Sequence, residues 1–229
     1  MFSVDLKKLT DLLQPLSFLL SNTLYPISCV GCGEKEVGLC AKCLVVLPPP
    51  DFKQEEEVVA VFSYQNKIVK RAIWKLKYRN GRYLAPILAE ALYERLLPEL
   101  ADLKLLKNWS DAVLIPVPLS TKRFKKRGYN QAELLAEALI EKDAGENFTL
   151  KKDILLRAID TPPQAEIKNK GERKNNVRGC FAVKNKELVR GKNIILIDDV
   201  STTGATLHEA EKALKKSGAR NFLKITVAK

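Results

Sequence analysis

Apolar runs alternate along the chain with stretches in which apolar residues recur every three or four positions. The runs predict strands, and the clearest are DAVLIPVPL at 111–119 and KNIILIDDV at 192–200. The recurring stretches predict helices, and one that follows Asn66, a suitable N-cap, carries an apolar stripe from Ile68 to Leu76. Strands are predicted at 57–64, 111–119, 155–159, 179–183, 192–200 and 221–229, and helices at 66–78, 83–101, 130–142 and 206–218.

The order of these elements predicts the fold class. Strands and helices alternate, and the strands are apolar almost throughout, which is typical of a parallel sheet covered on both faces. We therefore expect an α/β protein with an open parallel sheet flanked by helices. The stiff stretch LPPPDF, at 47–52, separates this main domain, expected at 51–229, from a small module at 25–50.

Residues 1–24 are predicted to form a separate amphipathic helix. Its leucines recur at helical spacing, as Leu6, Leu9, Leu12, Leu13 and Leu16. Polar residues and Pro15 interrupt the stretch too often for a membrane span, and the charge order and cleavage site of a signal peptide are missing. Packing on the rest of the protein is favoured over contact with a membrane, and we expect a cytoplasmic protein.

Four of the five cysteines form two closely spaced pairs, Cys29-x-x-Cys32 and Cys40-x-x-Cys43. Each pair can form a turn that points two thiolates at one metal ion, and two such turns complete a tetrahedral site. A reducing cytosol keeps such thiols available for metal. A structural zinc ribbon is therefore expected at 25–50, with two disulfides or an iron–sulfur site as the alternatives.

The chain is strongly basic, with 39 Lys and Arg against 27 Asp and Glu and a formal net charge of +12. A partner rich in phosphate explains this charge, and a solvated basic surface is the alternative. The stretch TKRFKKRGY, at 121–129, is the most concentrated part. Its basic residues Lys122, Arg123, Lys125, Lys126 and Arg127 are interleaved with Phe124 and Tyr129. Such a segment can grip a single-stranded nucleic acid backbone and stack its bases.

Two adjacent carboxylates end the apolar strand of ILIDDVSTTGAT, at 195–206, and small hydroxyl residues and a glycine follow at once. Ligands of open α/β sheets bind beyond the carboxyl ends of the strands. Backbone N–H groups at a helix N-terminus attract anions, and Gly204 lets a ligand approach closely. Asp198 and Asp199 can accept hydrogen bonds from two ribose hydroxyls or hold water around Mg²⁺. The pattern therefore predicts a site for a ribose 5-phosphate.

The same stretch resembles the signature of type I phosphoribosyltransferases, which bind phosphoribosyl pyrophosphate (PRPP). The blocks IPVPLSTKRFKKRGYNQAELLAEAL and LLRAIDTPPQAEIKNKGERKNNVRGCFAV, together with the four-cysteine ribbon, are similar to one branch of that group, the ComF family of competence-associated proteins. The likeness covers about residues 20 to 229. It implies that the domain at 51–229 is phosphoribosyltransferase-like.

The resemblance also implies roles for individual residues. It makes Asp198 and Asp199 the candidate catalytic acids, which hold the ribose hydroxyls. The loop around the 5-phosphate comprises Ser201, Thr202, Thr203, Gly204, Ala205 and Thr206. Residues 122–129 correspond to the loop that faces pyrophosphate, where Mg²⁺ binds with PRPP. A mobile loop at 157–181 offers Arg157, Gln164, Arg173 and Asn176 as ligand contacts, and its closure would exclude water.

Two classes of function remain open, because no segment is recognisable as the hood that reads the base in such enzymes. In the first, the protein binds PRPP or a nucleoside monophosphate and handles single-stranded DNA in natural transformation, with other competence proteins as further partners. In the second, it is an active phosphoribosyltransferase, a glycosyltransferase that moves ribose 5-phosphate from PRPP to a base or an amine in nucleotide salvage. The first is the favoured reading.

Overall fold

The computed structural model describes residues 27–51, 58–78, 81–107, 109–159 and 178–229. It divides the chain into two compact units between Val46 and Leu47. The helix expected at 1–24 lies outside the described residues. The smaller unit contains the helix α2 (Ala41–Val45) and an isolated bridge between Ser28 and Lys35.

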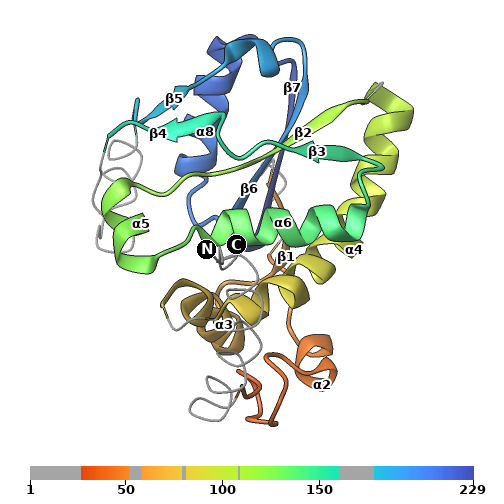
Figure 1. Cartoon of the computed structure of the whole chain (residues 1–229). Coiled ribbons are helices and arrows are strands. Elements are labelled where there is room, and N and C mark those ends of the chain that lie inside the picture. The colour runs from red at the N-terminus through yellow and green to blue at the C-terminus, as the bar shows by residue number, and fades with distance from the viewer. Residues whose placement is uncertain (1–26, 52–57, 79–80, 108, 160–177) are drawn as a thin grey trace, which may run out of the picture. The chain divides into compact units, whose positions relative to one another are not determined.

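A five-stranded sheet forms the centre of the larger unit, and Figure 1 shows it between layers of helices. The strands are β1 (Val58–Phe62), β7 (Asn221–Ala228), β6 (Asn193–Val200), β2 (Ala112–Pro116) and β3 (Phe148–Leu150), in that spatial order. All four neighbouring pairs are parallel. β2 is buried throughout, as expected for a parallel strand with both faces covered. The predicted fold class is therefore confirmed.

Helices and a small ribbon cover the sheet. The helices are α3 (Lys67–Tyr78), η1 (Gly81–Tyr83), α4 (Leu84–Lys107), α5 (Thr121–Arg127), α6 (Gln131–Asp143), η3 (Lys186–Leu188) and α8 (Ala205–Lys216). Val113 and Ile115 of β2 share one apolar cluster with α8 and with an antiparallel pair, β4 (Leu155–Arg157) and β5 (Phe181–Val183). Because strand side chains alternate between faces, Leu114 points to the other face, where α6 packs against β2 and β6.

The helix starts follow from local hydrogen bonds. The Asn66 side chain accepts from the backbone N–H groups of Ile68 at 2.8 Å and Val69 at 3.3 Å, which confirms its predicted cap role for α3. Asn130 caps α6 in the same way, through the N–H of Ala132. In α3 the stripe of Val69, Ala72, Ile73 and Leu76 is buried.

Three elements differ from the expectations. The sequence did not indicate β3, which has only three residues and pairs with β2 at the sheet edge. α4 runs to Lys107, well beyond the expected end at residue 101, and it contains Pro98. The segment at 121–127, expected as a loop, is the helix α5, which ends at Gly128 in the left-handed conformation (φ +76°).

Candidate functional site

The two acids at the carboxyl end of β6 face different neighbours. The Asp199 carboxylate is buried, and its Oδ2 atom lies 2.5 Å from the Lys77 ammonium of α3. Its Oδ1 atom accepts a hydrogen bond of 3.3 Å from the Gln131 side chain at the start of α6. Asp198 is half-buried, and its Oδ1 atom accepts the N–H of Asp199 at 2.8 Å. The opposed directions follow from the alternation of side chains along a strand.

These surroundings change how readily the groups ionise. Burial, followed by the charge of Asp199, raises the pKa of Asp198 to about 8. Burial alone would lower the pKa of Lys77, but the charge of Asp199 outweighs it, so the Lys77 pKa is raised. Lys77 is therefore a fixed cation beside the acid pair.

The loop from β6 to α8 supplies groups suited to an anion. Gly204 adopts φ +72° immediately before α8, and the space in front of its α-carbon is open for at least 4 Å. The Ser201 hydroxyl is buried and has no hydrogen-bond partner among the described residues. Thr202 is exposed, whereas Thr203 accepts a hydrogen bond from the N–H of Ala205 at 3.4 Å. Thr206 is half-buried in the first turn of α8. The partial positive charge at such a helix start favours phosphate.

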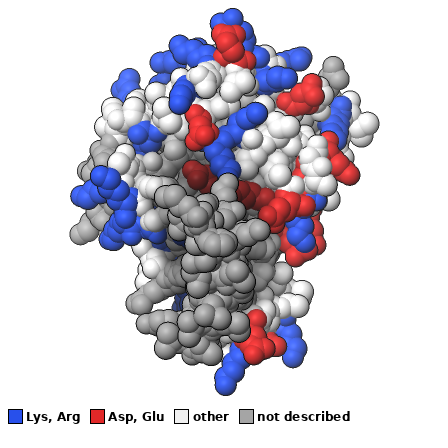
Figure 2. Space-filling view, in the orientation of Figure 1, with Lys and Arg blue, Asp and Glu red and all other residues white. Residues whose placement is uncertain are grey.

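The basic segment 121–129 divides into an exposed and a buried part. Figure 2 shows Lys and Arg side chains gathered on the left of the molecule, where Figure 1 has α5. Lys122, Phe124, Lys125 and Lys126 are exposed. Tyr129 is buried instead, because its hydroxyl donates to the Leu76 carbonyl at 2.6 Å and the Arg82 guanidinium covers its ring at 4.5 Å. Its ring is thus not available for stacking on a base.

The charges of Arg157, Arg127 and Asp198 all act on the Arg123 guanidinium. Burial, and then the charges of Arg157 and Arg127, lower the pKa of Arg123. Such mutual repulsion between cations is relieved when an anion binds among them. Arg157 lies on β4 with its guanidinium 5.5 Å from the centre of the Phe181 ring. Gln164, Arg173 and Asn176 of the expected mobile loop lie outside the described residues.

The four paired cysteines of the smaller unit come together. Their sulfur atoms all lie within 4.8 Å of one another. Cys40 Sγ lies 3.7 Å from Cys29 Sγ and 3.6 Å from Cys32 Sγ. A tetrahedral site with Zn–S bonds of about 2.3 Å requires sulfur separations of about 3.8 Å. All the described cysteines are free thiols, so the group could hold one zinc ion.

The surroundings of Cys29 favour a thiolate. Burial would raise the pKa of Cys29, but backbone N–H groups outweigh it and lower that pKa to about 6. Two of these groups belong to Cys40 and Gly31, at 3.3 and 3.4 Å from the sulfur. Four thiolates around a metal leave no open position, which is typical of a structural site.

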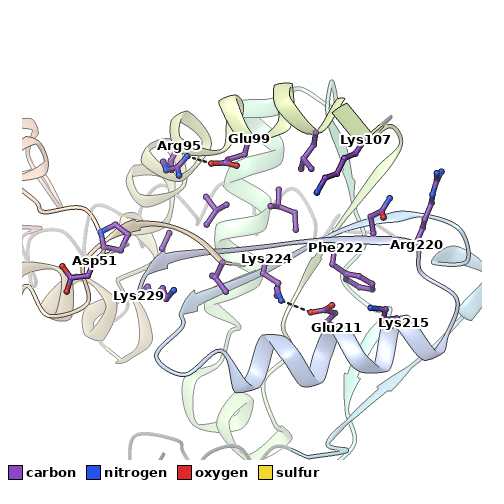
Figure 3. Close-up of a pocket in the computed structure, with 17 residues that line it drawn as sticks. Asp51, Arg95, Glu99, Lys107, Glu211, Lys215, Arg220, Phe222, Lys224 and Lys229 are labelled. Atoms are coloured by element: carbon purple, nitrogen blue, oxygen red, sulfur yellow. Dashed lines mark hydrogen bonds and ion pairs between the residues drawn. The ribbon is translucent and has the colours of Figure 1, made fainter. Parts of the chain in front are cut away.

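A cavity of about 540 Å³ lies along the strands β1 and β7 (Figure 3). It is lined by the first residues of β1 and β7 and by parts of α4 and α8, and none of its lining residues belongs to 198–206. Several of its charges are already paired, as Arg95 with Glu99 and Lys224 with Glu211, each at 2.9 Å. Ligands of parallel sheets bind at the carboxyl ends of the strands, whereas most of the strand residues that line this cavity belong to the first halves of β1 and β7.

Sequence reasoning missed Lys77 and Gln131, which hold Asp199. Both stand at the ends of amphipathic helices, where polar residues are ordinary, so no pattern marks them. The sequence analysis also did not identify Tyr78. In the structure, the Arg127 guanidinium lies 4.8 Å from the centre of the Tyr78 ring and donates to the Tyr78 hydroxyl at 3.1 Å.

Among the described residues, every helix is too short or too polar to cross a lipid bilayer.

Comparison with known proteins defines the class to which this fold and site belong. The family of phosphoribosyl transferase domains matches residues 79–228, which include the acid pair and the loop that follows it. Competence protein F of Haemophilus influenzae is 30% identical over 186 residues, which cover 80% of this chain and 75% of that protein. The chain therefore belongs to the ComF family of competence proteins and contains a phosphoribosyl transferase domain.

Two further relatives carry the name competence protein ComFC. The Bacillus subtilis protein is 41% identical over 106 residues, which are 46% of this chain and 39% of that protein. The Streptococcus pneumoniae protein is 30% identical over 162 residues, which are 71% of this chain and 63% of that protein. The chain thus matches less than two thirds of the length of either ComFC protein.

Proposed function

We propose that the loop at 198–206 binds the ribose 5-phosphate part of PRPP or of a nucleoside monophosphate, and that the protein handles single-stranded DNA in competence. The observation that carries the first part is the acid pair at the end of β6, beside an open left-handed turn at Gly204. Carboxylates accept hydrogen bonds from ribose hydroxyls, while the N–H groups of the turn and the start of α8 donate to the phosphate.

Magnesium belongs to this proposal as a companion of PRPP. It prefers oxygen ligands and usually keeps several waters, so the carboxylate oxygens of Asp198 and the diphosphate suit it. When bound, it would neutralise part of the diphosphate charge. Arg123, Arg127 and Arg157 lie where they can contribute the remaining positive charge.

The DNA part of the proposal rests on α5 and on the relatives. Lys122, Lys125 and Lys126 are exposed on a single helix, which suits the phosphates of a polymer better than a single buried anion. The relatives that carry the word competence in their names favour DNA as the polymer.

Transfer of ribose 5-phosphate to a base is the second candidate function. The electrostatic coupling of Arg123 to Arg127, Arg157 and Asp198 favours it, because such cations can stabilise a departing pyrophosphate. Release of pyrophosphate from PRPP in the presence of a panel of bases would establish this activity.

A pair of glycine substitutions tests the phosphate part. Gly204 and Gly191 both have positive φ, +72° and +68°, and open space in front of the α-carbon. Gly204→Leu and Gly191→Leu should therefore lose similar stability from backbone strain, about 1–2 kcal/mol. Only Gly204→Leu should weaken binding of ribose 5-phosphate in calorimetry, by about tenfold or more, because its side chain would fill the phosphate position. Equal affinity in the two variants would remove the turn from the site.

A further inference from the structure

Three large aromatic side chains are exposed on two helices beside the acid loop. Trp74 and Tyr78 of α3 and Phe124 of α5 are each 48% exposed, and we call them the aromatic surface. Trp74 and Tyr78 are four residues apart on one helix face, with ring centroids 6.1 Å apart and an interplanar angle of 49°. They lie outside the buried stripe of α3, which consists of Val69, Ala72, Ile73 and Leu76.

Arg127 connects the two helices that carry this surface. Its guanidinium lies 4.8 Å from the Tyr78 ring centre and donates to the Tyr78 hydroxyl at 3.1 Å. Phe124 is three residues before Arg127 on α5, and residues at this spacing are neighbours on a helix surface. The Arg127 guanidinium therefore joins the Tyr78 ring of α3 to α5, the helix that also carries Phe124.

A chain of contacts runs from the aromatic surface to the acid pair. Arg127 donates to the Gln131 side chain at 2.7 Å, and Gln131 donates to Asp199 at 3.3 Å. The Lys77 ammonium closes this chain by pairing with Asp199, and Lys77 directly precedes Tyr78. The aromatic surface thus adjoins the acid site, and the contacts of Arg127 with Tyr78 hold its α3 part next to α5.

We propose that the aromatic surface stacks the bases of single-stranded DNA whose phosphates are bound by the exposed lysines of α5. This inference rests on the proposed function, and it identifies residues that would contact the bases. A site for single strands combines cations that follow the backbone with aromatic rings on which bases stack. Both kinds of group occur here, the lysines on α5 and the rings on α3 and α5, and Arg127 adds a cation that can stack as well. Duplex DNA should not stack on these rings, because its bases already stack on one another.

The chain contains its own reporter of stacking. It has two tryptophans, of which Trp74 is 48% exposed and Trp109 is 2% exposed. Stacking of a base on Trp74 should quench its fluorescence, while Trp109 should not respond. Titration of the full chain with an oligothymidylate at low salt should therefore quench the emission, and Trp74→Phe should abolish the quench. A base-free polyphosphate of the same charge, and a duplex of the same length, should leave the emission unchanged.

Affinity should change in parallel with fluorescence. Fluorescence anisotropy with a labelled oligothymidylate should show that Tyr78→Ala and Trp74→Ala each weaken binding by about 5- to 150-fold, the range for loss of one stacked base. Leu106→Ala is the matched control, because Leu106 is an 81% exposed apolar side chain near the end of α4. It should bind as the wild type does, and circular dichroism melting checks that all three variants are folded.

The failures are distinguishable. Binding of an oligonucleotide without quenching would contradict stacking on the aromatic surface. Binding to Tyr78→Ala and Trp74→Ala as tight as to wild type would contradict it as well. Either result leaves the proposed DNA binding intact. Equal quenching by the base-free polyphosphate or the duplex also overturns stacking on the aromatic surface. A complete absence of oligonucleotide binding at low salt overturns both this inference and the DNA part of the proposed function, while the ribose 5-phosphate part stands.

Discussion

Asp198 and Asp199 are adjacent in sequence but differ in their surroundings. Asp199 is buried and held by Lys77 and Gln131, so its charge is balanced before any ligand arrives. Asp198 lies beside that charge and is partly accessible, and its pKa of about 8 keeps it largely protonated at neutral pH. An ionised carboxylate accepts hydrogen bonds more strongly than a protonated one, so a sugar that donates hydrogen bonds to both acids should favour loss of the Asp198 proton.

This proton produces a pH dependence with a definite sign. Ribose hydroxyls donate to an ionised carboxylate, so affinity for ribose 5-phosphate should rise with pH. With a pKa of about 8, the ionised fraction of Asp198 increases about tenfold between pH 7 and pH 9, and the affinity measured by calorimetry should follow.

Stability of the ligand-free protein should change in the opposite direction. The folded-state pKa of Asp198 lies above its unfolded value, so the folded state binds the proton more tightly. The proton on Asp198 therefore contributes to the free energy of unfolding. This contribution is fully present below about pH 4 and is lost as the pH rises through 8. Asp198→Asn, which does not titrate, should remove both dependences. Wild-type affinity that stays constant from pH 7 to pH 9 would contradict the assignment of Asp198.

At the residue scale, the sequence predicts what local pattern encodes. The end of an apolar strand, two acids and a Gly before a helix are contiguous, so the 198–206 loop could be recognised without a structure. Lys77 is different, because its importance depends on where α3 docks against the end of β6, and that is a property of tertiary packing. Tyr129 shows the reverse error, since an aromatic ring within a basic segment looks accessible until its buried hydrogen bond is seen.

At the scale of elements, the helical form of α5 matters for binding. A flexible loop would lose conformational entropy when it binds a strand, whereas a helix presents its lysines in a fixed order. Gly128 ends the helix in the left-handed conformation and turns the chain towards Tyr129 and α6. α5 escaped prediction because its seven residues bury no side chain, so no apolar stripe indicates a helix.

Charge reversal on α5 should weaken binding of single-stranded DNA. Lys125→Glu with Lys126→Glu should remove two of the proposed phosphate contacts, so affinity should fall for every sequence and its dependence on salt should become shallower. Anisotropy across a salt series measures both effects.

The matched control for this reversal lies on α8. Lys215 and Lys216 are also two adjacent exposed lysines in the last turn of a helix. Reversing them changes the net charge and the helix end by the same amount, yet binding should stay close to wild type. Equal loss in the two double variants would mean that net charge alone, rather than α5, attracts the DNA.

The sheet shows the same limit of local pattern. β2 and β6 contain apolar runs that are long enough to be recognised as strands, and both were predicted. β3 has three residues, of which Thr149 is exposed, and it exists because the edge of β2 is available for pairing. Likewise, β4 and β5 were predicted as strands, but their antiparallel pairing with each other, outside the main sheet, depends on tertiary contacts with α8.

At the scale of the whole molecule, the parallel sheet explains why the acid loop and α5 come together. β2 and β6 are neighbours, so the segments that leave their carboxyl ends begin side by side, although about 70 residues separate them in the chain. One of these segments contains α5, and the other is the 198–206 loop. The alternation of strands and helices predicted this arrangement in outline, and the family match agrees with it.

The central claim is that the acid pair and the loop after it form a site for ribose 5-phosphate, which lies beside the proposed DNA-binding surface but does not include its lysines and aromatic rings. Calorimetric titration of PRPP with Mg²⁺ into wild type and Asp199→Ala tests it most directly. Because this substitution leaves Lys77 without its acid, the double variant Lys77→Met with Asp199→Ala serves as the control for a freed charge. Both variants should lose affinity for PRPP by about 1–3 kcal/mol, since ribose hydroxyls would lose their acceptor, while oligonucleotide affinity stays unchanged. PRPP affinity equal to wild type in both folded variants would contradict the account.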